Sequence, residues 1–421
     1  MAADGKGLVG QAGAVLLRRL ADRVGLTRGL AGVPPSSTSA GWRERVGVLV
    51  QLAVTMVLVA RSVLEAEQLQ LHHQGMFSPA SSDSTMRRLL AEFDDKTLMK
   101  IAKVRRYVRT LLHLRPGGFP WLTVAGRRLT GWIVVDLDAT VITSASRKEG
   151  AAATFKGTFG FHPLGGWLAN TGESLPMELR AGNAGANTVD DHLRILTAAL
   201  DQIPHSSQSK ILVCVDGAGA THGLLEHLQA LNTKRRTVRC TVGWKITPED
   251  EAAIARLPEN AWETSLKQDG KLQTGYQVAE LTGLNTRGGW PEGMRLIVRR
   301  VRPSRRHMEK LTAFEQKTRV RTNKAMGLAN LPSQSWQINT GWMLAANLAA
   351  DLDTRLWLLT LHDQDSLEDA EPDTMCLRLY HLPARLVRHA RRRILCIERT
   401  WPWATAFTTS WNRITQLPVV T

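Results

Sequence analysis

The sequence contains little cysteine for its length. Four cysteines occur in 421 residues, and they are scattered at Cys214, Cys240, Cys376 and Cys396, with no two of them separated by only two residues. Structural zinc sites usually need such closely spaced pairs, and small secreted domains need many disulfides. The scarcity of cysteine therefore argues against a structural zinc site and against a disulfide scaffold. It is typical of a protein from a reducing cytosol.

The chain also lacks a long hydrophobic run. Its longest apolar stretch, VGVLVQLAVTMVLVA at residues 46–60, contains Gln51 and is shorter than the ~20 residues that a membrane-spanning helix needs. The first residues, MAADGKGLVGQAG, show no basic segment followed by an apolar core, so we expect no secretory signal. These patterns predict a buried helix over residues 46–60. They also predict a cytoplasmic, nucleoid-associated protein that binds no membrane.

Acidic residues are fewer than basic ones. The chain has 54 Lys and Arg against 38 Asp and Glu, which gives a net charge of +16. An excess of this size favours a polyanionic partner, usually nucleic acid. The alternative is a soluble protein that is basic without such a partner. With 43% hydrophobic residues the chain is globular, and its length allows two or three domains.

The first 115 residues have a helical pattern. Apolar and basic positions alternate at helical spacing in AVLLRRLADRVGLTRGL, residues 14–30, and a central glycine gives this segment the look of a helix-turn-helix. A Pro/Ser/Gly linker follows at 32–41, and further helices are expected over 42–113, with a break where Ser82 or Asp83 could cap a helix. We therefore expect residues 1–115 to form a helical DNA-binding region. Its candidate DNA contacts are Arg18, Arg19, Arg23 and Arg28.

From Trp132 onward the pattern changes to strands. GWIVVDLDATVI is the first, and residues 157–170 and 173–182 contain the second and third, joined by a turn at Asn170 to Gly172. An amphipathic helix over 187–203 and an apolar strand, KILVCVDGAGA, come next. Three strands, a helix and a further strand is the order of an RNase H-like α/β fold. In that fold the first and fourth strands lie side by side.

Acidic side chains occur in both of the most apolar strands. Asp136 and Asp138 share one face of the first strand because they are two residues apart, and Asp216 ends the fourth. Carboxylates from adjacent buried strands repel each other unless a cation lies between them or one stays protonated. Mg²⁺ binds carboxylate oxygens, and two such ions about 4 Å apart can support phosphodiester cleavage. Together with a basic surface, this pattern indicates a nuclease-type or transposase-type enzyme.

A second interpretation comes from the spacing D-x-D-x-T, which resembles the nucleophile motif of haloacid-dehalogenase-type phosphatases. In such an enzyme Asp136 would be phosphorylated. The interpretation needs a later acidic motif of the form G-D-x-x-x-D, and the segment VDGAGATH offers one acid without a partner. The phosphatase is therefore the weaker alternative.

A long segment, residues 136–200, resembles the core of DDE-type transposases of bacterial insertion sequences, of the family numbered thirteen-eighty. Its most distinctive pieces are KEGAAATFKGTFGFHPL and RAGNAGANTVDDH, and the likeness continues to RHARRRILCIERTWPWA near the C-terminus. The resemblance implies an RNase H-like catalytic domain and two Mg²⁺ (or Mn²⁺) ions. It also implies movement of a DNA element through its terminal inverted repeats and a target DNA, with a homodimer assembled on DNA.

The resemblance also implies roles for single residues. Asp138 and Asp216 correspond to the first and second catalytic acids, which bind the metal ions, and Asp136 is either a neighbour of the site or an acid that faces solvent. Several residues of the distinctive segments could contact DNA or brace the metal ligands, although a structural hydrogen bond is an equal alternative for each. They are Lys156, His162, Arg180, Asn183 and Asn187.

The third acid of the family, a Glu on a helix, is missing from its expected place. In the family an Arg precedes this Glu by four positions and a Lys follows it by seven. If Lys324 is that lysine, Lys317 stands where the Glu should be and Ala313 where the Arg should be. Glu315 is two residues away, about 200° around the helix. We therefore predict an internal deletion that removed the catalytic Glu; the alternative is that Glu315 or Glu309 serves.

These observations predict four parts. They are a helical DNA-binding region (1–115), the first part of an RNase H-like core (128–235), a shortened β-rich insertion (236–306) and a helical remainder (307–421), with helices over 308–330, 340–363 and 375–395. Basic runs at 234–236, 299–306 and 388–393 are candidate phosphate contacts. The candidate DNA contacts outside the first region are Lys156, Arg299, Arg300, Arg321 and Lys324. Two functions remain open: a transposase that cleaves and transfers DNA strands, and a remnant that binds DNA without cleaving it.

Overall fold

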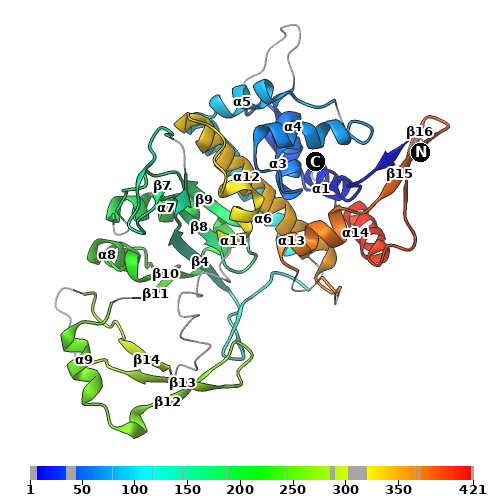
Figure 1. The fold of residues 1–421 in the computed structure, drawn as a ribbon. Coiled ribbons are helices and arrows are strands. Elements are labelled where there is room, and N and C mark those ends of the chain that lie inside the picture. Colours follow the sequence, from blue (N-terminus) through cyan, green and yellow to red (C-terminus); the bar gives the residue numbers. More distant parts are fainter. Residues whose placement is uncertain are drawn as a thin grey trace.

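The computed structural model describes residues 7–34, 44–77, 79–115, 117–144, 147–185, 188–243, 245–284, 290–301, 320–364, 366–367 and 370–418. Helices and several separate sheets make up a mixed α/β architecture (Figure 1). The long helix α12 (Trp336–Leu356) runs between the N-terminal helices and the largest sheet (Figure 1). No described helix is long and apolar enough to span a membrane.

The N-terminal helices pack around α12 and form the larger hydrophobic core. Helix α3 (Arg45–Val57) lies against α12 and is buried along nearly its whole length, which confirms the buried helix predicted from the apolar run. Ser82 accepts a hydrogen bond from the amide of Thr85 and caps α5, as the sequence predicted. The remaining helices of this part are α1 (Ala14–Arg23), α2 (Leu26–Leu30), α4 (Val63–His72), α5 (Asp83–Ala91) and α6 (Asp95–Thr110), which a 3-10 turn (Leu111–Leu114) extends.

The largest sheet has five strands in the order β11-β10-β4-β8-β9. Strands β4, β10 and β11 are parallel, whereas β8 is antiparallel to both β4 and β9. The helix α7 (Val189–Asp201) covers one face, where Ile195 and Ala199 approach the β4 side chain Leu137 across Gly166. Within this sheet the strands and α7 follow the predicted order, but the second strand predicted over 157–170 is divided, because Phe159–Phe161 belongs to a separate sheet. The strands are β4 (Trp132–Ala139), β8 (Leu164–Leu168), β9 (Ser174–Glu178), β10 (Lys210–Val215) and β11 (Thr237–Val242).

Smaller elements flank this sheet. Strands β5 (Ile142–Thr143), β6 (Ala152–Ala153) and β7 (Phe159–Phe161) form a sheet of their own, and β2 (Thr123–Val124) pairs with β3 (Arg127–Arg128). Beyond β11, a three-stranded sheet and α9 lie apart from the five-stranded sheet (Figure 1). Its strands are β12 (Glu263–Leu266), β13 (Leu272–Glu280) and β14 (Ile297–Val301), and its helix is α9 (Pro248–Ala255). The helix α8 (His222–Ala230) and 3-10 turns at His205–Ser207, Gly217–Gly219 and Glu259–Ala261 complete this half.

The helix predicted over residues 375–395 is wrong for most of its length. Helix α13 (Pro372–Met375) and a π turn (Cys376–Tyr380) end before Pro383, and β15 (Ala384–His389) and β16 (Arg392–Ile397) then form a hairpin. Proline cannot donate to a helix, and apolar residues that alternate with arginine suit a strand with one covered face. The short strand β1 (Leu8–Val9) pairs with the hairpin, and α14 (Ala404–Gln416) follows it.

Helical structure around residue 325 is short. Helix α11 (Val320–Asn323) leads into a π turn (Lys324–Leu328) that is interrupted at Met326 and Gly327, where the positive φ of 96° suits glycine. The first part of the helix predicted over 308–330 lies outside the described residues. The helix predicted over 340–363 corresponds to α12 and the π turn Trp357–Leu361 that extends it.

Candidate functional site

The acidic residues of the two apolar strands lie at one end of the five-stranded sheet. Strands β4 and β10 are parallel neighbours, and Val215 lies opposite Leu137. Asp216 directly follows Val215 and Asp138 directly follows Leu137, so the same register continued by one residue would bring the two acids side by side. Neighbouring strands are about 4.8 Å apart, a spacing at which two carboxylates in such a register could share a cation. Asp138 is half-buried and Asp216 is exposed, so the pair stands at the rim of the sheet.

Asp136 and Asp138 lie on the face of the sheet opposite to α7. On the neighbouring strand β8, Trp167 lies opposite Asp136 and Gly165 lies opposite Asp138. The Trp167 ring covers the glycine so closely that a Cβ atom on Gly165 would lie 2.7 Å from it. Asp136 also lies opposite Cys214 on β10. Burial and, to a smaller degree, the Asp136 carboxylate raise the pKa of the Cys214 thiol to about 11. The site is therefore walled by Trp167 on one side and opens at Asp138.

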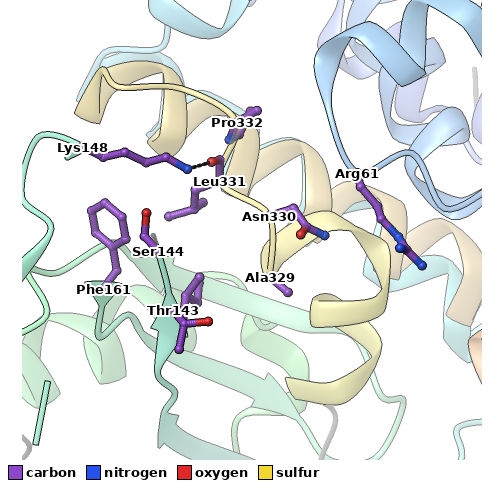
Figure 2. A pocket seen from close by; sticks show the side chains of 10 residues that line it. Arg61, Thr143, Ser144, Lys148, Phe161, Ala329, Asn330, Leu331 and Pro332 are labelled. Carbon is purple, nitrogen blue, oxygen red and sulfur yellow. Dashed lines mark hydrogen bonds between the residues drawn. The ribbon is translucent and has the colours of Figure 1, made fainter. Parts of the chain in front are cut away.

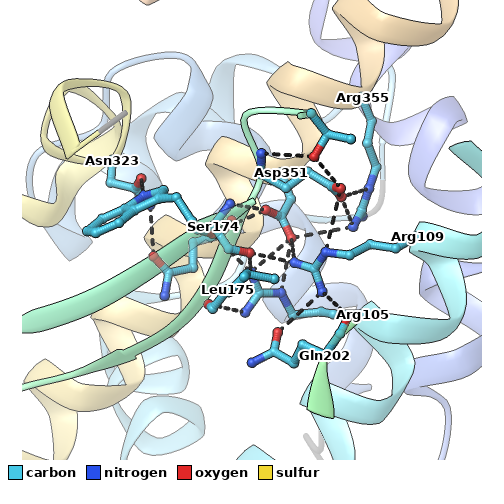
Figure 3. A network of polar contacts seen from close by, with 12 residues as sticks. Arg105, Arg109, Ser174, Leu175, Gln202, Asn323, Asp351 and Arg355 are labelled. Atoms are coloured by element: carbon cyan, nitrogen blue, oxygen red, sulfur yellow. Dashed lines mark hydrogen bonds and ion pairs between the residues drawn. The ribbon is translucent and has the colours of Figure 1, made fainter. Parts of the chain in front are cut away.

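Hydrogen bonds between side chains link α11 to this face of the sheet. Trp167 Nε1 donates to Asn323 Oδ1 at 3.0 Å, and Asn323 Nδ2 donates to Asn347 Oδ1 on α12 at 2.8 Å (Figure 3). Both asparagines are buried, so each lost bond would leave an unpaired polar group. Asn323 thus holds the end of α11 on the face of the sheet that carries Asp136 and Asp138.

The same network continues into a buried cluster of charges (Figure 3). Asp351 on α12 accepts hydrogen bonds from Arg105 at 3.0 Å and from the amide of Ser174 on β9 at 3.1 Å. Arg355 pairs with Glu173 at 2.6 Å, and Arg109 approaches the Glu173 carboxylate at 3.5 Å. Burial opposes the charged form of Asp351, but the guanidinium groups outweigh it and lower the Asp351 pKa. The cluster joins α6, α12 and β9, and so sets where the helices stand relative to the sheet.

Comparison with known proteins identifies the family of the chain. The sequence model of the family described as "Transposase DDE domain group 1" matches residues 1–314 and 312–419.

The chain belongs to this family of DDE transposases.

The two matched segments of this transposase meet at residues 312–314. Among solved structures, the chain is similar to the piggyBac transposase in a synaptic complex with hairpin DNA, with 11% sequence identity and a TM-score of 0.37, over 87% of this chain and 78% of that one. No curated protein matches the sequence.

Two residues from the distinctive segments of the transposase have structural partners. Arg180 donates to the His162 carbonyl at 3.0 Å and to Asp191 at 2.8 Å, and Nδ1 of His162 lies 3.0 Å from the Ala184 carbonyl. Burial lowers the pKa of His162, and its contact with the Ala184 carbonyl acts against this shift. These contacts favour the bracing role over direct DNA contact. Lys156 and Asn183 are exposed, and Asn187 lies outside the described residues.

Most of the arginines named in the predicted DNA-binding region make contacts within the protein itself. Gly25, with a positive φ of 76°, separates α1 from α2, so the helix–glycine–helix arrangement exists. However, Arg19 lies 4.1 Å over the Trp411 ring and donates to Thr415 Oγ1, while Arg23 donates to the Thr415 and Leu417 carbonyls. Arg18 pairs with Asp22 at 3.2 Å, and Arg28 is exposed. Arg19 and Arg23 therefore hold α14 against α1, and a DNA contact by these residues stays a prediction.

The other candidate residues are spread over the chain. Arg300 on β14 pairs with Glu259 at 2.5 Å and stacks on Trp262, and Arg299 lies 5.9 Å from the Tyr276 ring. Lys324 opens the π turn that follows Asn323. Glu315 and Glu309, and the Arg321 side chain, lie outside the described residues. Within the described ranges, no cluster of three or more His, Cys, Asp or Glu side chains could hold a metal ion.

A cavity of about 410 Å³ lies between β5 and the loop after the π turn (Figure 2). Thr143, Ser144 and Lys148 line it on one side, and Asn330 and Arg61 on the other. The Lys148 ammonium donates to the Leu331 carbonyl, and burial lowers the Lys148 pKa. Its lining residues include two cations and no carboxylate, so this cavity suits an anionic group rather than a metal ion.

The sequence interpretation missed the residues that assemble the site. Arg105 and Arg109 follow Ile101 at intervals of four on the buried face of α6, and two cations on an apolar stripe are the one signal that could have revealed them. Trp167, Asn323 and Asn347 gave no such signal, because hydrogen bonds across 156 and 24 residues leave no local pattern.

Proposed function

We propose that this chain is a DNA transposase of RNase H-like fold in which Asp138 and Asp216 bind the divalent metal ion used for strand cleavage. The observation that supports the proposal is the parallel register of β4 and β10, in which Leu137 pairs with Val215, the residues that directly precede Asp138 and Asp216. The antiparallel run β4, β8, β9, followed by α7 and the parallel strand β10, supports the RNase H-like assignment. Membership in the DDE transposase family supports the reaction.

The donor set fits Mg²⁺ or Mn²⁺. Both groups are carboxylates, and Mg²⁺ prefers oxygen ligands while it keeps several of its waters. A bound ion would polarise the scissile phosphate and lower the pKa of an attacking water. Asp138 and Asp216 would hold this ion, while Trp167 and Gly165 shape the wall beside it. Asp136, which adjoins Cys214 and Trp167, would shape the site rather than bind the metal.

The third acid determines whether the enzyme is active. We infer an internal deletion that has placed Lys317 where the catalytic Glu should stand, and the junction of the two matched segments at 312–314 supports a break in this part of the chain. Without the third carboxylate a second metal ion would be held loosely. The Lys317 ammonium, standing in place of the Glu carboxylate, would compete with the metal ion for the two aspartates. The favoured activity is therefore DNA binding with weak strand cleavage, and a DNA-binding remnant without cleavage is the second candidate.

Metal binding tests the proposal without relying on cleavage. We expect Mn²⁺ titrated into the protein, and followed by electron paramagnetic resonance, to bind one site. Asp138→Asn and Asp216→Asn should each weaken this binding tenfold or more, because each removes one of two carboxylate ligands. Asp136→Asn is the matched control on the same strand face, and it should change Mn²⁺ affinity little. If Asp136→Asn abolished binding and Asp216→Asn did not, the assignment of the ligands would be wrong.

DNA binding is tested with the segments that flank the gene. Duplexes from these segments should bind better than random duplexes, and all binding should weaken steeply with salt as counterions are released. Two copies of the chain should join two such duplexes, since transposases act on paired element ends. Equal affinity for flanking and random duplexes would contradict sequence-specific recognition of the flanking segments. Binding that does not depend on salt would contradict the proposed contacts with DNA phosphates.

A further inference from the structure

The loop between β6 and β7 presents an aromatic side chain to solvent. Phe155 is 70% exposed, and Phe159, at the start of β7, is 46% exposed. A single exposed apolar residue is ordinary, but two phenylalanines on one short hairpin make a patch. Lys156 is also exposed, and its ammonium lies 5.7 Å from the Phe155 ring centre. The tip of the loop thus combines a bare aromatic face with a positive charge.

The loop holds Phe155 in this position by its own hydrogen bonds. The Thr154 amide donates to the Thr158 carbonyl at 2.7 Å, and the Gly157 amide donates to the Thr154 carbonyl at 3.0 Å. The hydroxyls of Thr154 and Thr158 are 2.7 Å apart, and Gly157 takes the positive φ of 72° that the tight turn needs. The exposure of Phe155 is therefore a fixed feature of the hairpin. A preformed surface of this kind loses little entropy when a ligand binds.

The loop belongs to the small sheet whose strand β7 leads through His162 into β8 of the five-stranded sheet. The Phe155 ring packs against His162 with ring centres 5.3 Å apart. His162 lies three residues before Gly165, which is opposite Asp138. Arg180 and the Ala184 carbonyl hold His162 in place. Phe155 therefore packs on a braced histidine that lies just before β8, the strand paired with Asp138.

We propose that Phe155 is a stacking surface for an unpaired DNA base next to the scissile phosphate, with Lys156 on the adjoining backbone phosphate. This proposal rests on the proposed DNA-cleaving function. A flat exposed ring beside a cation matches single-stranded nucleic acid, because every base offers a face to stack and every nucleotide carries a negative charge. The excess of 54 basic over 38 acidic residues favours this occupant over an acidic or neutral protein. Holding one base out of the helix would expose the phosphate to Asp138 and Asp216.

The test uses a forked duplex with 2-aminopurine at successive positions of its single-stranded arm. Stacking on an aromatic ring quenches 2-aminopurine, so the wild-type protein should quench at least one position. Phe155→Ala should abolish this quench and weaken fork binding roughly tenfold, the lower part of the range for one stacked base. Phe155→Trp should retain both, and affinity for a blunt duplex should be unchanged in each variant. The melting temperature should also stay the same, because the ring is mostly exposed.

Tyr107→Ala is the matched control, since Tyr107 is an aromatic residue on α6 that is 52% exposed. It should leave the quench and the fork affinity unaltered. If wild-type protein binds the fork and Phe155→Ala quenches as the wild type does, the stacking role is refuted while the DNA function stands. If wild-type protein binds neither fork nor duplex, the proposed function itself fails. If Phe155→Ala instead changes the oligomeric state of the DNA-free protein in solution, the patch is a protein interface and the proposal is overturned.

Discussion

Single carboxyl groups in this molecule respond to their surroundings in opposite directions. Asp353 on α12 is fully enclosed and accepts a hydrogen bond from the Tyr380 hydroxyl. Burial raises its pKa from 3.8 to about 6, against the lowering effect of this bond. Asp363 is largely exposed, and its bond to Arg413 lowers its pKa. One carboxyl therefore favours the protonated state in the fold, and the other favours the charged state.

Asp353 should make the protein less stable as the pH rises from about 4 to about 6. Between these values the folded chain holds a proton that the unfolded chain has lost, so the free energy of unfolding falls with pH. Asp353→Asn imitates the protonated form, keeps the acceptor for Tyr380, and should raise stability at pH 7 by up to about 3 kcal/mol. The check is the midpoint of urea unfolding, measured for wild type and variant from pH 4 to pH 7.5.

Asp363→Asn is the comparison for this experiment. Its lowered pKa contributes stability that is lost as the pH falls, so the variant should be slightly destabilised at pH 7 and less so in acid. If Asp353→Asn lowered the free energy of unfolding at pH 7, burial of the Asp353 carboxylate would not be the destabilising factor.

At the scale of single elements, the C-terminal hairpin is the clearest departure from the sequence interpretation. Residues 384–397 contain Leu, Val and Ile between arginines, which suits a strand as well as it suits a helix. The turn at Ala390 and Arg391 has positive φ values of 46° and 64°, and neither residue type signals such a turn. The strand β1, whose Leu8 pairs with Arg385 from the other end of the chain, completes this sheet. Local pattern could not supply that pairing.

The hairpin should bind DNA phosphates. Arg388 lies directly across from Arg393, and His389 lies across from Arg392. Like charges placed opposite each other destabilise a strand pair, and a polyanion would relieve the repulsion. A two-stranded ribbon also fits the major groove of DNA. The double change Arg388→Gln and Arg392→Gln, at two arginines whose side chains form no hydrogen bond or ion pair with a described residue, should lower the slope of log affinity against log salt by about 2.

Arg194→Gln provides the matched control for the hairpin. Arg194 is similarly exposed, but its charge is already neutralised by Glu178 and Asp191 at 2.7 and 2.6 Å. Fluorescence anisotropy of a labelled duplex across a salt series would separate the two cases. An unchanged slope in the double variant would exclude the hairpin from the DNA interface.

At the scale of the whole molecule, the order of strands could be predicted and the assembly around them could not. Apolar strands that end in Asp138 and Asp216, with an amphipathic helix between them, were sufficient to predict their adjacency. The buried cluster of Arg105, Arg109 and Asp351 joins segments up to 246 residues apart, and no spacing in the sequence encodes such a meeting. Breaking this cluster would leave buried charges unpaired, so it fixes how the helices meet the sheet.

DNA binding and DNA cleavage should be separable in this molecule. If the proposed deletion has removed the third carboxylate, we expect strand cleavage in Mg²⁺ at least about 100-fold below that of a site with its full set of ligands, because the water and the second metal would no longer be held in place. Lys317→Glu restores a carboxylate at the position that counting from Lys324 assigns to the third acid, and it should raise cleavage of plasmid DNA carrying the flanking segments. Lys317→Gln removes the competing ammonium without adding a ligand, so it should raise cleavage less. Glu315→Gln should change cleavage little, both in the wild-type chain and in the Lys317→Glu variant. If Glu315→Gln instead abolishes cleavage by the wild-type chain, Glu315 is the third acid and the deletion has not removed activity.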